Sequence, residues 1–341
     1  MKLILTEEIK EEIVHYFDSN KSDYIFSTGN IFKISLAGKK YLCKIPSNNP
    51  FLYFRLARRL FRLDKSNAFF NYQQTSVIII YKGKVFQYSL KNKEIKKISD
   101  LKQCRCVLHD SIVVTKDLIA FGEYGRNAKR KSVPIWQSND DGETFNIACE
   151  LDNIKHVHGI YSDSYSDSLW ITTGDNDGEC FLIEAQQSNF SRLVYYGDGS
   201  QSWRTVSLIF AKDKIVWIMD SPNIIPKLQS FDRVTGEIEE GHSFDAPVWY
   251  TKRFEDGSYL IQTSIEPGDA IKSSSSKVYF SEDYKNWKEV ASFQKDNYPK
   301  VLFKFGVISF AAGIQSTDCF VISGEALRSI DGKSFICKIA R

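Results

Sequence analysis

From residue 67 to the end of the chain, hydrophobic and polar positions alternate in short blocks. Apolar and aromatic runs of strand length, such as 77–81, are separated by turns rich in Gly, Asp, Asn and Ser, which is typical of all-β proteins. Grouped in fours, these runs form units of roughly 35–50 residues, the period of propeller blades. We therefore predict an all-β fold, a six-bladed β-propeller over residues 67–341, with blades near 67–101, 104–152, 155–198, 203–246, 247–296 and 300–341.

Residues 1–66 follow a different pattern. Residues 6–16 place apolar side chains at helical spacing, residues 24–46 are typical of two or three short strands, and residues 51–63 predict a second helix with a leucine stripe. We expect a short extension of helix and hairpins that packs on the propeller and is not an independent domain. The other face of the second helix is basic, and we expect it to be solvated, with contact to a membrane surface or an acidic partner as the alternative; its arginines are Arg55, Arg58, Arg59 and Arg62.

Composition narrows the class of protein. Hydrophobic residues make up 43% and aromatic residues 14% of the chain, enough for a large core, and the net charge of +3 is too close to neutral to indicate a nucleic-acid binder. The sequence shows no signal peptide and no apolar run of membrane-spanning length, so we expect a cytoplasmic protein. The seven irregularly spaced cysteines predict reduced thiols.

Three short motifs of similar composition recur between predicted strands. Residues 138–145 read Ser-Asn-Asp-Asp-Gly-Glu-Thr-Phe, and related stretches occupy 281–287 and 329–335. In such a motif the Ser and Asp side chains bond the backbone of a tight hairpin, and the aromatic residue packs beneath it. We place each motif between the third and fourth strands of a blade and assign it a structural role.

These motifs resemble the Asp-box (BNR repeat) repeats of the sialidase-like β-propeller superfamily. The resemblance covers about residues 67–341 and implies six blades. Sialidases carry an Arg-Ile-Pro motif, and the nearest match here is Lys44-Ile45-Pro46, so sialidase activity is not carried over. The stretches 156–160 and 173–175 are similar to those of bacterial propellers associated with polysaccharides, a non-sialidase branch.

Polar residues gather in the connections that lie opposite the Asp-box end of a propeller. Loops on a rigid scaffold often carry function, and the D–A and B–C connections of successive blades open at one end of the axis, so we predict a single axial pocket. The expected catalytic residues are Glu179, Asp220, Asp175, His158 and Glu266, with Glu179 and Asp220 favoured as the acid–base pair. The expected substrate-binding residues are His156, Gln201, Trp203, Arg204, Glu123, Arg126 and Trp249.

Each of these residues also has a structural interpretation. The histidines are equally typical of hydrogen-bonded residues at a blade junction, Arg204 of an ion pair with Glu179 or Asp220, and Trp203 of a core residue.

Three functions fit this residue set. The first is a glycoside hydrolase acting on a bacterial polysaccharide or oligosaccharide, because glycosidic cleavage needs two facing carboxylates. The second is a metal-assisted polysaccharide lyase in which His156, His158 and a side chain such as Gln201 or Glu179 hold a divalent ion against a uronate carboxylate. The third is a non-catalytic glycan-binding or scaffold propeller. Nothing in the sequence requires a cofactor. The histidine and acidic residues are compatible with a divalent metal ion.

Overall fold

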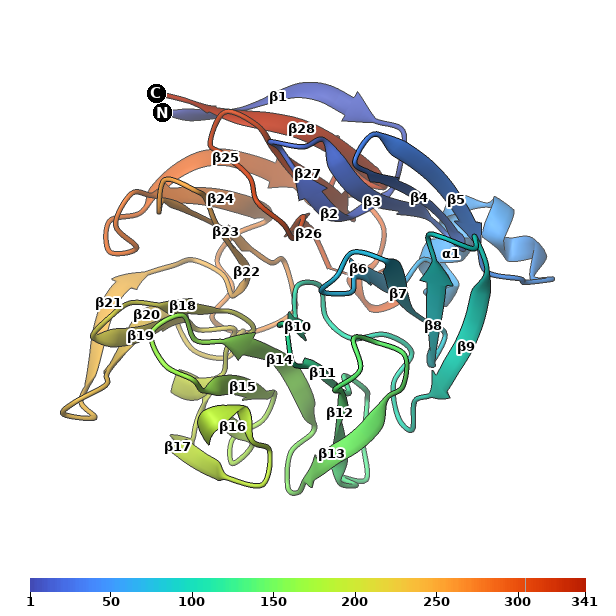
Figure 1. The fold of residues 1–341 in the computed structure, drawn as a ribbon. Helices are drawn as coiled ribbons and strands as arrows, with labels where there is room; N and C mark the ends of the chain where they lie inside the picture. Colours follow the sequence, from blue (N-terminus) through green and yellow to red (C-terminus); the bar gives the residue numbers. More distant parts are fainter. Residues whose placement is uncertain (304) are drawn as a thin grey trace. The chain divides into compact units, whose positions relative to one another are not determined.

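The computed structural model describes residues 1–303 and 305–341, and its strands form seven four-stranded sheets (Figure 1). Five of the sheets are β2 (Ile13–Asp18), β3 (Asp23–Thr28), β4 (Ile31–Leu36), β5 (Lys39–Lys44); β6 (Ser66–Phe70), β7 (Ser76–Tyr81), β8 (Lys84–Ser89), β9 (Ile95–Asp100); β10 (Val113–Val114), β11 (Ile119–Gly122), β12 (Val133–Ser138), β13 (Asn146–Leu151); β14 (His156–Ser162), β15 (Leu169–Gly174), β16 (Cys180–Ala185), β17 (Leu193–Gly199); and β18 (Leu208–Phe210), β19 (Lys214–Ile218), β20 (Lys227–Asp232), β21 (Ile238–Ser243).

The remaining two sheets complete the set. One is β22 (Val248–Arg253), β23 (Tyr259–Thr263), β24 (Ser275–Ser281) and β25 (Lys288–Gln294), and the other is β26 (Val307–Phe310), β27 (Phe320–Glu325), β28 (Lys333–Ala340) and β1 (Lys2–Ile9). The short helices are η1 (Pro50–Tyr53), α1 (Arg55–Phe61), η2 (Gln186–Ser188), η3 (Gln201–Trp203) and α2 (Lys300–Phe303).

The protein is therefore an all-β seven-bladed β-propeller, and the prediction of six blades is wrong. The additional blade comes from the segment that was expected to be an N-terminal extension: β2–β5 form a complete sheet, and β1 pairs antiparallel with β28, from Lys2 opposite Ala340 onward. The expected helix over 6–16 is replaced by parts of β1 and β2. Because β1 pairs on one side only and is largely exposed, its acidic residues face water, and the alternation of a half-buried strand is lost from the sequence.

The chain divides into two compact units, residues 1–69 with 245–341 and residues 70–244. In the second unit, side chains of β10–β17 pack into one apolar cluster that includes Ile135, Ile160, Ile171 and Ile183. Trp217 of β19 anchors another cluster with Trp170 of β15. These clusters fix the ends of β14, β15 and β19, where the polar residues of interest lie.

The predicted helix over 51–63 forms in part, as η1 and α1, but its two faces differ from those expected. Within α1, Arg58 and Arg59 are buried, whereas Leu56 and Leu60 are exposed. Of the leucine stripe only the two ends, Leu52 and Leu63, pack inward, because charged side chains occupy the inward face of α1.

The Asp-box motifs do not all occupy the same place in their sheets. Residues 138–145 and 281–287 lie between third and fourth strands, β12 and β13 and β24 and β25. Residues 329–335 lie between β27 and β28, which are the second and third strands of their sheet because β1 is the fourth. We expected all three motifs between third and fourth strands, and this is wrong for the third motif. The expectation took β28 as the last strand of its sheet, whereas the last strand is β1.

Two further features bear on the sequence expectations. Among the described residues, the helices are all too short or too polar to cross a membrane. The seven cysteines are free thiols, and burial raises the pKa of Cys43 and Cys337 to about 12.

Candidate functional site

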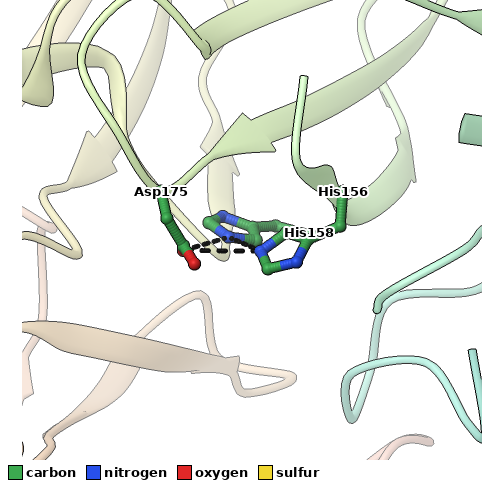
Figure 2. Close-up of side chains that lie close together, drawn as sticks. All are labelled: His156, His158 and Asp175. Atoms are coloured by element: carbon green, nitrogen blue, oxygen red, sulfur yellow. Dashed lines mark hydrogen bonds and ion pairs between the residues drawn. The ribbon is translucent and has the colours of Figure 1, made fainter. Parts of the chain in front are cut away.

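A cluster of two histidines and one aspartate lies where β14 begins and β15 ends, within the unit of residues 70–244 (Figure 2). His156 is the first residue of β14, and His158 follows at a β-bulge: Val157 pairs with Thr173 and Gly159 with Thr172, so His158 is the additional residue. Such bulges redirect side chains locally. Both imidazoles are almost fully buried, with 4% and 1% of their side-chain surface exposed.

Backbone carbonyl groups fix the protonation of both imidazoles. Nδ1 of His156 lies 2.8 Å from the carbonyl oxygen of Gly125, and Nδ1 of His158 lies 2.8 Å from that of Thr205. A carbonyl oxygen only accepts hydrogen bonds, so each Nδ1 carries a proton, and in the neutral ring each Nε2 presents a lone pair. Burial lowers the pKa of His158, although Asp175 opposes the effect, and this favours the neutral ring.

The two Nε2 atoms and one carboxylate oxygen converge on a single point. Nε2 of His156 and Nε2 of His158 are 3.1 Å apart, and Oδ1 of Asp175 lies 3.4 Å and 3.3 Å from them. Burial raises the pKa of Asp175, but hydrogen bonds and charge from the imidazoles in their protonated form outweigh burial and hold the pKa of Asp175 well below its usual range. Three electron-pair donors this close repel one another unless a cation lies between them, either a proton on one imidazole or a metal ion.

Two basic side chains contact the same carboxylate. Lys155 bonds Oδ2 of Asp175, while Nη2 of Arg204 lies 3.2 Å from Oδ1. Arg204 also donates to the backbone carbonyl of Asp175, at 3.1 Å, and through Nε to Asp220 Oδ2, at 3.3 Å. Its guanidinium therefore links Asp175 on the β15–β16 connection to Asp220 after β19, and the planar group suits several simultaneous acceptors.

Further polar side chains form hydrogen bonds to the backbone of the loop that contains Asp175. Gln201 in η3 donates to the carbonyl of Asp175, at 2.9 Å, and accepts from the hydroxyl of Ser221, at 2.7 Å. Gly174 lies close to these groups: a Cβ there would be 3.2 Å from both Arg204 Cγ and His158 Cε1. A side chain at residue 174 would therefore require these neighbours to move by a few tenths of an ångström.

Six predicted residues come together here: His156, His158, Asp175, Gln201, Arg204 and Asp220. Glu179 instead bonds Arg130, and its other carboxylate oxygen accepts from Asn176 at 3.1 Å. The predicted acid–base pair is thus divided between two arginines, because Asp220 bonds Arg204.

Other predicted residues have contacts that explain them structurally. The Glu123 carboxylate accepts from the backbone amide groups of Lys102 and Gln103 and from Trp136 Nε1, at 2.9 Å for the indole. Trp203 is half-buried, stacks on Trp217 with ring centroids 5.2 Å apart and packs against the apolar cluster of Trp217. Arg126 is exposed.

Glu266 and Trp249 belong to the other compact unit. Trp249 Nε1 donates to Glu266 Oε1 at 3.0 Å, and the hydroxyl of Ser264 donates to the same oxygen at 2.8 Å. Their membership of one pocket with the histidines stays a prediction.

Sequence reasoning missed three contributors. Lys155 directly precedes His156, and Tyr124 places its ring 4.1 Å from the His156 ring, centroid to centroid. The third is the pair of backbone carbonyls of Gly125 and Thr205. An aromatic residue in the 122–127 connection is a signal that was available, whereas carbonyl direction has no signature in the sequence.

Comparison with known proteins agrees with the fold. The chain is similar to the WD40 β-propeller domain of Doa1, with 9% identity over 99% of this chain and 97% of that chain and a TM-score of 0.57. It is likewise similar to a chain of the mitotic checkpoint complex, with 8% identity, 99% and 93% coverage and a TM-score of 0.58. A third similar structure is YCF48 bound to D1 peptide, with 10% identity, 99% and 95% coverage and a TM-score of 0.57. No protein-family model and no curated protein sequence matches this chain. At these identities the similarity establishes the β-propeller fold.

Proposed function

We propose that His156, His158 and Asp175 bind a divalent metal ion. The observation that carries this proposal is the direction of the lone pairs: both Nδ1 atoms donate to backbone carbonyls, so both Nε2 atoms face Asp175 Oδ1 as acceptors. Hydrogen bonds from the distal nitrogen to a carbonyl are the usual support of metal-binding histidines.

The spacing of the three atoms supports the same proposal. Their separations of 3.1, 3.3 and 3.4 Å are those of one face of a tetrahedron whose centre lies about 2.0 Å from each atom, the bond length of zinc to nitrogen or oxygen. Two histidines and one carboxylate also form the facial set that binds other first-row divalent metals and leaves coordination positions open.

The surroundings favour an anionic ligand on such a metal. Lys155 and Arg204 place two positive charges against Asp175, whose side chain keeps 18% of its surface exposed. A carboxylate on the ligand complements this set through charge, and the open positions of the metal are filled by oxygen.

We therefore propose that this protein acts on an acidic carbohydrate, by metal-assisted elimination rather than by hydrolysis. In such a lyase reaction a base removes the proton from the carbon next to the uronate carboxylate, the C–O bond one carbon further breaks, and the leaving oxygen takes a proton. A metal and arginine at the carboxylate stabilise the negative charge that develops there. For hydrolysis two carboxyl groups must face the scissile bond, and here Glu179 and Asp220 are each engaged by a different arginine.

The relation to Asp-box propellers of the non-sialidase, polysaccharide-associated branch is part of the proposal. It is supported by the turn at 138–145, in which Asp140 accepts from Ser138, from the Thr144 amide at 2.9 Å and from the Thr144 hydroxyl at 2.6 Å. Those are the hydrogen bonds that the motif is expected to make.

Metal binding is tested on the purified, chelator-treated protein by titration calorimetry with Zn²⁺ and Mn²⁺. We expect one site per chain, and His158→Ala is expected to lower the affinity at least about a hundredfold. His242→Ala, on the exposed strand β21, is the matched control. Equal affinity of all three proteins would overturn the metal site and would leave a shared proton as the cation between the imidazoles.

The reaction is tested with oligosaccharides that contain uronic acids and with their neutral counterparts. We expect metal-dependent ultraviolet absorbance from an unsaturated product, abolished by chelation and by His158→Ala. New reducing ends without this absorbance, resistant to chelation, would contradict elimination and restore hydrolysis. Binding without turnover would assign the protein to the glycan-binding class.

A further inference from the structure

The helical segment that follows β5 is anchored by buried arginines. Arg59 has 1% of its side chain exposed, donates to the carbonyl of Phe303 at 2.7 Å and pairs with Asp296. Arg58 pairs with Glu12 and donates to the carbonyl of Leu52. The fold thus places charged groups where a helix of a globular protein ordinarily places leucine.

Arg55 completes this anchor. Its guanidinium lies 2.8 Å from Asp64 and 3.1 Å from Asp331. Burial opposes its charge, but the surrounding carboxylates, Glu12 first, outweigh burial and raise the pKa of Arg55. Because Arg55, Arg58 and Arg59 form ion pairs within the protein, any contact with an acidic surface has to be made by other residues.

The outward side of the same segment is apolar. Tyr53 is 80% and Phe54 64% exposed, and the rings of Phe51 and Phe61 lie 5.1 Å apart on the same side. Soluble proteins seldom leave so many large apolar groups together in water. We call the following exposed residues the apolar face: Phe51, Tyr53, Phe54, Leu56, Leu60 and Phe61.

The stretch of sequence that carries the apolar face has charge of one sign. From residue 24 to residue 63 the sequence contains no Asp or Glu, whereas Asp23 and Asp64, which bound this stretch, are buried. The exposed charged residues of this stretch are all basic: Lys33, which pairs with Glu11, and Lys39, Lys40, Lys44 and Arg62.

We propose that the apolar face docks the protein on an anionic lipid surface. Protruding aromatic rings flanked by lysine and arginine insert into the headgroup region of a bilayer, which needs no complementary pocket, while the basic residues contact anionic headgroups. A second copy of this chain is a poor occupant, because a symmetric contact would bring the same basic residues together. An acidic protein partner would neutralise the lysines but would require a groove for six projecting side chains.

The proposal is tested by sedimentation with vesicles of phosphatidylcholine alone and of phosphatidylcholine mixed with phosphatidylglycerol. We expect the protein to bind the mixed vesicles, with binding weakened by salt. The variant Phe51→Ser/Phe54→Ser/Phe61→Ser is expected to lose at least about tenfold in partitioning. The variant Tyr165→Ser/Tyr195→Ser removes two rings that are each 48% exposed elsewhere and is expected to bind as the wild type does.

A second readout does not depend on loss of binding. In Phe54→Trp, insertion into the bilayer is expected to shift tryptophan emission to shorter wavelength on mixed vesicles only. Absence of binding by the wild type, equal binding by the triple serine variant with an unchanged melting temperature, or an unshifted Phe54→Trp spectrum would each overturn the proposal. A concentration-dependent dimer that the triple variant abolishes, without vesicle binding, would also overturn it and assign the apolar face to self-association.

Discussion

The Nε2 atoms of His156 and His158 lie 3.1 Å apart although each ring carries its proton on the opposite nitrogen. An ordinary pair of buried histidines would place a donor against an acceptor. Here the carbonyls of Gly125 and Thr205 prevent this in the neutral state, and Asp175 adds a third acceptor. The fold therefore prepares a position for a cation before any ligand arrives.

Added zinc is predicted to stabilise the protein through this position. A ligand that binds only the native state raises the free energy of unfolding, by about 2.7 kcal/mol at a hundredfold excess over its dissociation constant. We expect Zn²⁺ to raise the melting temperature of the wild type by a few degrees and to leave that of His156→Ala unchanged. Calorimetric scans of both proteins with and without Zn²⁺ make the comparison, and a rise of equal size in the variant would place zinc elsewhere.

The sequence was sufficient to predict part of this site. The strand pattern predicted His156, His158, Asp175 and Asp220 at one end of successive sheets. The structure brings the side chains of the first three together and links Asp220 to Asp175 through Arg204. The contacts that determine the role of each residue in the site could not be predicted from the sequence. The direction of the Gly125 carbonyl and the contact of Lys155 with Asp175 depend on tertiary packing, which no local pattern encodes.

The blade count failed for a related physical reason. The uncounted blade is β2–β5, whose first strand, Ile13–Asp18, overlaps the segment expected to be a helix over 6–16. A β-bulge between Val14 and Tyr16 breaks the period-two alternation of this strand, so its apolar residues appeared at helical spacing. Similarly, the leucine spacing of 51–63 indicated a helix but not which face is buried. Ion pairs of Arg58 and Arg59 with distant acids decided that orientation.

The turn at 138–145 is predicted to contribute to stability through Asp140. Its carboxylate accepts three hydrogen bonds from Ser138 and Thr144, so Asp140→Ala should lower the free energy of unfolding by about 1–2 kcal/mol. Asn139→Ala, at an exposed neighbouring position, should change it little. Thermal unfolding of both variants gives the test, and equal melting temperatures would show that the turn forms without the carboxylate.

Acid is predicted to weaken a second such turn at Asp283. Partial burial raises the pKa of this residue, but hydrogen bonds from Asn286 and the Lys285 amide outweigh burial and lower the pKa to about 2 from 3.8. A carboxyl group whose pKa is lower in the folded state than in the unfolded state stabilises the fold at pH values above the unfolded-state pKa. This stabilisation is lost as the pH falls from about 3.8 towards about 2. We expect the difference in melting temperature between the wild type and Asp283→Asn to shrink across that window. A difference that stays constant with pH would contradict the assignment.

Arg204 is predicted to be the residue on which the stability of the site depends most. Its guanidinium contacts Oδ1 and the carbonyl of Asp175 and also Asp220, and both carboxylates are largely buried. Arg204→Met leaves them without this partner, and removal of one member of a buried ion pair typically costs about 3–5 kcal/mol. Arg204→Lys keeps the charge but lacks the planar, spread donors that reach these acceptors in their different directions, so it should fall between the wild type and Arg204→Met in thermal unfolding. Arg126→Met, which removes an exposed arginine, serves as the matched control and should melt with the wild type. If Arg204→Met instead melts with the control, the two carboxylates are satisfied without the guanidinium, and Arg204 is held in place for a ligand rather than for the fold.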